Sequence, residues 1–148
     1  MIVASGTSLT SSHIIARYEP DGSLDEGFAG DGTVNFGTPG VADNLVHSYG
    51  IALQSDGKIV VAGMDGSLQG TVRRYLASGV IDASFGVDGD VRFEGVDFKP
   101  RHLAVQSDGK ILVMGKSGDG SVLKVFRYAG DGTLDSAFGE AGHSLVDF

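Results

Sequence analysis

The sequence repeats one phrase three times, and the steps from Arg17 to Arg74 and from Arg74 to Arg127 are 57 and 53 residues long. Each copy runs from Arg-Tyr through a Gly-containing turn to an Asp and then a Phe. A long, nearly fixed period is typical of repeat architectures, in which each copy forms one supersecondary unit. Residues 1–148 are therefore interpreted as a single repeat domain. The repeated positions are Arg17, Asp25 and Phe28, then Arg74, Asp82 and Phe85, then Arg127, Asp135 and Phe138.

The central copy predicts four short antiparallel strands. Asp56-Gly57 separates two apolar-rich runs at 49–54 and 59–63, and Asp-Gly in that position is typical of a two-residue hairpin turn of type I′. Turn-rich segments separate two further runs, at 71–76 and 90–94. Four such strands with short connections form an up-and-down sheet.

The predicted strands at 59–62 and 111–114 are apolar at every position. A sheet with one face in water alternates apolar and polar residues instead, so both faces are expected to be covered. Four-stranded sheets packed face to face around an axis form a β-propeller. The expected fold class is therefore all-β, with three four-stranded antiparallel blades. A β-helix is the alternative repeat fold, but its rungs are normally much shorter than the 53-residue repeat.

The phrase Gln-Ser-Asp-Gly-Lys-Ile, followed by Arg-Tyr and by Asp-Gly-x-Leu-Asp-x-x-Phe-Gly, resembles the bacterial delta-60 repeat, a β-propeller repeat. The resemblance covers essentially the whole chain. It implies a propeller within a large bacterial surface or secreted protein, often beside adhesion modules, and it implies little about biochemical activity. The expected location is therefore extracellular or at the cell surface.

Three positions depart from the repeated pattern. Ala29 stands where the later copies have Gly86 and Gly139, and Ser78 replaces the Asp of the other two turns. Ser144 replaces the Val found at this position in the earlier copies. The apolar pattern shifts there, so the last strand is expected to slip register or to pair differently.

Alignment of the copies places Met1 opposite Lys58, so the first blade is predicted to lack its innermost strand. The blades are predicted at about residues 1–36, 48–93 and 100–148. Closed propellers have about 4 to 8 blades, and three alone would leave two broad apolar faces exposed. Completion by further blades of a parent chain or by copies of this chain is therefore expected. A homo-oligomer is the hypothesis preferred, with a dimer favoured over a trimer.

The repeated Arg, Asp and Phe are predicted to be structural. An Arg and an Asp eight residues later suit an internal clamp, because the planar guanidinium can bind a carboxylate bidentately. The Phe is predicted to plug the core between blades. The members are Arg17 with Asp25, Arg74 with Asp82, Arg127 with Asp135, and Phe28, Phe85 and Phe138.

The net charge of −8 argues against nucleic acid as a partner, because phosphate recognition needs a basic footprint. No apolar run approaches the roughly 18 residues that a membrane span needs, so no membrane insertion is expected. The chain has no Cys, and its four His residues lack metal-ligand spacing. Its Gly-Asp-Gly segments precede no helix that could bind phosphate. No cofactor and no metal are expected.

Connections at one end of the blades keep a constant length, whereas those at the other end vary, and variable loops carry function. A binding site is therefore expected at the variable end, where residues leading into the innermost strands converge. Their mixture of aromatic and polar groups suits a glycan or a peptide, although an ordinary polar rim would look the same. The candidates are Asn44, His47, Tyr49, Asp97, Lys99, Arg101 and His102.

The function favoured by these patterns is a non-enzymatic module for binding, adhesion or display. A propeller hydrolase or lyase acting on glycans is one alternative. It would need carboxylates converging on the channel, and the segments 49–54 and 101–106 contain no Asp or Glu. A spacer that oligomerises without a ligand is the other alternative. No catalytic residue is assigned.

Overall fold

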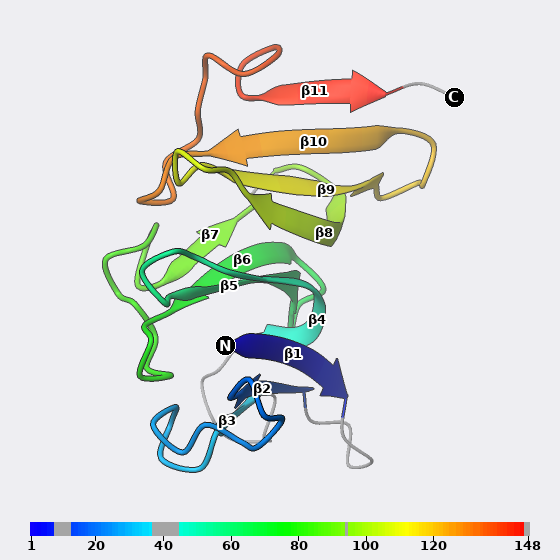
Figure 1. Ribbon diagram of the computed structural model, residues 1–148. Coiled ribbons are helices and arrows are strands. Elements are labelled where there is room, and N and C mark those ends of the chain that lie inside the picture. The colour runs from blue at the N-terminus through cyan, green and yellow to red at the C-terminus, as the bar shows by residue number, and fades with distance from the viewer. Residues whose placement is uncertain (8–12, 37–44, 94, 147–148) are drawn as a thin grey trace.

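The computed structural model describes residues 1–7, 13–36, 45–93 and 95–146. These residues form eleven strands and no helix, arranged as three antiparallel sheets that stack on one another (Figure 1). The first sheet, or blade, contains β1 (Ile2–Thr7), β2 (His13–Tyr18) and β3 (Thr33–Phe36). The second contains β4 (Leu45–Leu53), β5 (Ile59–Asp65), β6 (Gly70–Tyr75) and β7 (Asp90–Arg92). The third contains β8 (Phe98–Val105), β9 (Ile111–Ser117), β10 (Leu123–Tyr128) and β11 (His143–Val146).

The order of strands within each blade follows the chain, as the hairpin pattern predicted. In the part of the chain that the structure describes, the second and third blades have four strands, and the first has three, with no strand equivalent to β4 and β8. The all-β propeller-blade architecture inferred from the repeat is therefore confirmed.

Every residue of β5 is buried, because the strand has a blade on each side. Ile59 and Val61 belong to an apolar cluster shared with the first blade, whereas Val60 and Ala62 belong to one shared with the third. Successive residues of a strand point to opposite faces, so the continuous apolar run reflects two covered faces. The first cluster contains Ile15, Phe28, Ile59, Val61 and Tyr75, and the second contains Val60, Ala62, Val72, Phe85, Phe93, Phe98, Ile111, Val113, Phe126 and Tyr128.

The second and third blades approach each other closely at their innermost strands. A Cβ added to Gly50 of β4 would lie 2.9 Å from the backbone nitrogen of Leu103 in β8. Glycine permits two backbones to come this close because it has no side chain. The contact brings the innermost edges of the blades together, as a propeller requires.

The type I′ turn predicted for Asp56-Gly57 is wrong. Of the two, only Gly57 has a positive φ, of 83°. The nitrogen of Gln54 donates to the oxygen of Lys58 at 2.8 Å, and the nitrogen of Gly57 donates to the oxygen of Gln54 at 3.0 Å. These bonds enclose a three-residue loop that ends in a left-handed glycine. The Asp56 carboxylate stabilises the loop by accepting a bond from the nitrogen of Lys58 at 3.2 Å.

The register slip predicted for the last strand is also wrong. Ser144 pairs with Val125, which is the register that the second blade uses at the same place. A small turn precedes the final strand of both blades, at 87–90 and 140–143, and its backbone hydrogen bond is the same in each. The turn therefore fixes the register, and the side chain at position 144 does not.

Each repeated Arg contacts the Asp eight residues later. The Nε–Oδ2 distances are 2.7 Å for Arg17, 2.8 Å for Arg74 and 2.8 Å for Arg127. The pairing is not the bidentate clamp that the sequence suggested, because Nη1 of the first two arginines donates to a backbone oxygen of the next blade. The acceptors are Ala77 and Gly130 respectively. One guanidinium therefore closes its own blade and bonds the following one.

The repeated Phe lies beneath the same guanidinium. The distances from Arg Cζ to the ring centroid are 4.8, 4.6 and 4.5 Å for Phe28, Phe85 and Phe138. Cation–π contacts of this kind stabilise by about 0.5 to 2 kcal/mol, more when desolvated. Phe28 and Phe85 are fully buried, so each ring supports both the arginine and the junction between blades.

Ala29 adopts the left-handed backbone of the glycines that occupy its position in the other copies. Its φ is 55°, and Gly86 and Gly139 each have a φ of 57°. The nitrogen of Ala29 donates to the oxygen of Ser78 in the second blade, and the nitrogen of Gly86 donates to the oxygen of Asp131 in the third, both at 2.9 Å. The bond to the next blade therefore helps to hold a non-glycine residue in this conformation.

Asp82 makes the fold sensitive to acid. Burial raises its pKa, but hydrogen bonds from Ser84 and Lys58 and the charge of Arg74 outweigh burial and lower the pKa to about 2. In an unfolded chain the pKa of Asp is about 3.9. The ionised carboxylate therefore stabilises the fold above a pH of about 4, and this stabilisation is lost as the pH falls toward 2.

We expect the melting temperature, followed by circular dichroism, to fall across this pH window in the wild-type chain. The Asp82→Asn variant should melt lower at neutral pH, and its melting temperature should depend less on pH between about 4 and 2. An acid profile parallel to that of the wild type would contradict the role assigned to Asp82.

Candidate functional site

Tyr49 and Arg101 occupy equivalent positions on the innermost strands of the second and third blades. The pairing register of β4 shifts at Tyr49, and that of β8 shifts at Arg101. Such β-bulges re-aim a side chain, and they are over-represented beside active sites. These two bulges therefore lie at equivalent points of two neighbouring strands.

The structure brings Tyr49, Arg101 and His47 together, and we call these three residues the inner-strand cluster. Cζ of Arg101 lies 4.6 Å from the centroid of the Tyr49 ring. The rings of His47 and Tyr49 are stacked, with centroids 6.1 Å apart and an interplanar angle of 21°. The Tyr49 side chain is 38% exposed. The cluster therefore presents an aromatic group and a cation to solvent on adjacent blades.

Arg101 gives this cluster a positive charge that no described carboxylate neutralises. The residue is exposed, and no carboxylate of the described residues forms a salt bridge with it. Its strand, β8, also carries Lys99 and contains no acidic residue. A guanidinium has five N–H donors in a planar arrangement that fits a carboxylate. An acidic chain thus presents a locally cationic strand.

Two of the predicted ligand residues contact a loop of the third blade. Nζ of Lys99 donates to the oxygen of Gly118 at 3.2 Å, and the nitrogen of Gly118 donates to the backbone oxygen of Asp97 at 2.8 Å. These bonds attach the connection between β9 and β10 to the start of β8. His102 is exposed on β8. Asn44 lies outside the described residues.

The innermost strands begin earlier than predicted, at Leu45 and Phe98. His47 and Lys99 therefore lie within strands, and the prediction that they precede the strands is wrong, whereas Tyr49, Arg101 and His102 lie in strands as the segments 49–54 and 101–106 predicted. Two features hid the strands in the sequence. The bulges break the alternation of side chains, and Pro100 cannot donate to a sheet ladder, so it suggests a strand end.

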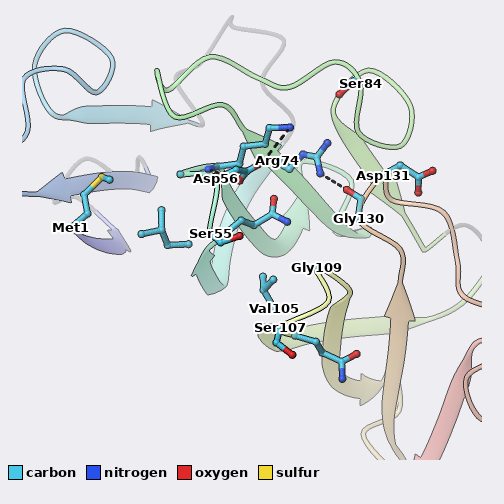
Figure 2. Close-up of a pocket in the computed structure, with 15 residues that line it drawn as sticks. Met1, Ser55, Asp56, Arg74, Ser84, Val105, Ser107, Gly109, Gly130 and Asp131 are labelled. Atoms are coloured by element: carbon cyan, nitrogen blue, oxygen red, sulfur yellow. Dashed lines mark hydrogen bonds and ion pairs between the residues drawn. The ribbon is translucent and has the colours of Figure 1, made fainter.

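A hollow of about 1170 Å³ lies beyond the C-terminal ends of β4 and β8 (Figure 2). The sequence predicted no site at this end of the blades. The Gln-Ser-Asp-Gly turns of two blades line it together with Met1, and Arg74 reaches toward Gly130 beside it. Variable loop lengths predict a site at the opposite end of the blades, so they give no signal for this hollow. The repeated Gln at 54 and 106 was the available signal.

The side-chain oxygens of Gln54 and Gln106 are buried in equivalent positions and accept no hydrogen bond from the described residues. A buried acceptor without a partner costs about 1 to 3 kcal/mol. Both residues line the hollow.

The described innermost strands β4 and β8 contain no acidic residue. Neither β4 nor β8 contains an Asp or a Glu, and no group of three potential metal ligands occurs within the described ranges. Glycoside cleavage usually requires two carboxylates flanking one bond.

The residues described here include no helix with the length and apolarity needed to cross a bilayer.

Antiparallel blades that stack face to face and meet at their innermost strands define a repeat protein of the β-propeller class. The chain belongs to the family described as a domain of unknown function (DUF5122) beta-propeller, which matches residues 1–28, 54–85 and 106–138. These segments make up more than half of the chain, and each contains one copy of the repeated Arg, Asp and Phe. Searches of curated proteins and of solved structures found no match.

Proposed function

We propose that this chain is a non-enzymatic binding module whose inner-strand cluster recognises a glycan that carries a carboxylate. The observation that carries the proposal is the contact between Tyr49 and Arg101, two exposed residues at equivalent bulges of neighbouring blades. An aromatic ring provides an apolar face for a sugar ring, and the guanidinium provides a bidentate partner for a carboxylate. A peptide ligand is the competing possibility.

The setting of this module is also part of the proposal. The resemblance of the repeats to the delta-60 type supports a role in adhesion or display within a bacterial surface or secreted protein. A hydrolase or lyase has weaker support, because the inner strands lack the paired carboxylates that glycoside cleavage usually needs.

Replacing Arg101 with Ala should lower the affinity for a carboxylated glycan about 10- to 100-fold, because a charge-assisted bidentate pair is lost. An array of neutral and acidic glycans would identify the ligand, and calorimetry would then measure the affinities. Tyr49→Ala should also weaken binding, whereas Tyr49→Phe keeps the ring and should bind almost normally. Arg101→Lys keeps the charge but should not restore the full affinity.

The matched control is Arg92→Ala. Arg92 lies at the end of the outermost strand β7, and its side chain is 41% exposed, so the control removes an equal charge far from the inner strands. Equal affinity of wild type and Arg101→Ala for every bound glycan would contradict the proposal. Binding of peptides but of no glycan would reassign the site to a peptide ligand.

A further inference from the structure

The two junctions between blades use the same pair of hydrogen bonds. At the first junction, Arg17 Nη1 donates to the oxygen of Ala77, and the nitrogen of Ala29 donates to the oxygen of Ser78. At the second junction, the corresponding donors of the second blade bond to residues 130 and 131 of the third. In both cases the earlier blade donates and the turn of the later blade accepts. The contact thus has a direction.

The third blade presents the donor half of this contact, and no described residue accepts from it. Arg127 Nη1 and the nitrogen of Gly139 are equivalent to the donors above, and neither forms a hydrogen bond within the described residues. The Arg127 side chain is 21% exposed, against 8% for Arg17 and 6% for Arg74. Phe138 is half-buried, although its equivalents are fully buried.

The first blade presents the acceptor half. Its turn, Pro20-Asp21-Gly22, is equivalent to 77–79 and to 130–132, and its own backbone bonds are the same. A Cβ added to Gly79 or Gly132 would meet the Phe of the preceding blade, at 3.2 and 3.1 Å, whereas one added to Gly22 meets nothing within 4 Å. The turn is thus already folded and is uncovered.

The apolar residues of both end faces are also more exposed than their equivalents at the internal junctions. Ile2 is 57% exposed, and the equivalent Ile59 is completely buried against the first blade. At the opposite end, Leu112 and Met114 are half-buried, whereas the equivalent Val60 and Ala62 are completely buried. Each end face therefore exposes apolar residues whose equivalents are buried at the internal junctions.

We infer that a second copy of this chain docks on the third blade by its first blade, repeating the internal junction. We call the acceptor face the head surface and the donor face the tail surface. Arg127 Nη1 donates to the oxygen of Pro20 of the second copy, and the nitrogen of Gly139 donates to the oxygen of Asp21. Two copies that each contribute one head and one tail close a ring with two-fold symmetry. The head surface contains Ile2, Ala4, Pro20, Asp21 and Gly22, and the tail surface contains Leu112, Met114, Arg127, Phe138 and Gly139.

The test is the mass of the 148-residue chain by light scattering at micromolar concentration. The wild type should have twice the chain mass of 15.3 kDa. Ile2→Glu places a charge in the head surface without disturbing a buried residue, and it should raise the dissociation constant by about 100-fold, because an unpaired charge would be buried. Met114→Glu should do the same from the tail surface. Val87→Glu is the control, because Val87 is 77% exposed and belongs to neither surface.

Mixing the two variants tests the direction of the contact. Ile2→Glu retains an intact tail and Met114→Glu retains an intact head, so the mixture should form a heterodimer through one junction although each variant alone is a monomer. Circular dichroism should show that the monomeric variants are folded. The inference is overturned if the wild type is a folded monomer, or if it is a dimer that Ile2→Glu does not weaken. Glycan binding is a separate readout, since Arg101→Ala should leave the dimer intact.

Discussion

Replacing Arg74 with Ala should lower the free energy of unfolding by about 3 kcal/mol, the lower end of the range for breaking a buried ion pair. Arg74 and Asp82 are both buried, and their atoms Nε and Oδ2 are 2.8 Å apart. Within the described residues, the substitution leaves Asp82 with Lys58 as its one charged partner, at 3.2 Å. It also removes the donor to Gly130 in the third blade. Chemical denaturation followed by circular dichroism measures the loss.

The matched comparison is Arg127→Ala. Arg127 makes the same pair with Asp135, but it is more exposed and forms no bond to another blade among the described residues, so its loss should cost clearly less. Both substitutions should be made in the Ile2→Glu background, where the inferred contact between copies is absent. Equal losses at the two positions would show that the bond across the junction contributes nothing to stability.

Replacing Phe85 with Ala should cost about 3 to 5 kcal/mol, the range for removing a buried Phe. The Phe85 side chain is completely buried in the cluster between the second and third blades. Neighbouring strands cannot easily collapse into the space, because hydrogen bonds of two sheets fix their positions. The Arg74 guanidinium would also lose the ring that lies 4.6 Å from its Cζ.

A double-mutant cycle separates these contributions. If the ring and the guanidinium stabilise each other, the loss in the Arg74→Ala, Phe85→Ala double variant should be smaller than the sum of the single losses. Phe138→Ala, at the half-buried end of the array, should cost less than Phe85→Ala. Additive losses at positions 74 and 85 would contradict direct coupling.

The fold could be predicted from the repeat because each feature of the repeat determines the structure of a short segment. The apolar run of β5 indicated two covered faces, and the repeated turn residues indicated where strands end. The hairpin at Asp56-Gly57 was placed correctly but given the wrong geometry, because the same dipeptide fits a two-residue and a three-residue loop. The register of β11 depends on a backbone turn, and Ser144 alone gave a misleading signal.

The candidate site was less predictable than the fold. Tyr49 and Arg101 were identified as candidates, but their contact depends on two bulges, and a bulge has no regular period in a sequence. Lys99 and Asp97 belong to the same set of candidates, but Lys99 Nζ and the backbone oxygen of Asp97 both bond to Gly118. The hollow beside Gln54 forms only when three blades meet, so no single segment of sequence reveals it.

The acceptors at both junctions are main-chain carbonyls, of Ala77 and Ser78 in one case and of Gly130 and Asp131 in the other. A carbonyl is the same whatever side chain accompanies it, so the contact is indifferent to the identity of the accepting residues. Any unit that folds this turn can supply the acceptors for any unit that carries the arginine. Duplication of a gene segment could thus lengthen such an array without requiring a new set of hydrogen bonds between blades. The sequences of the inner strands can then vary independently of these bonds.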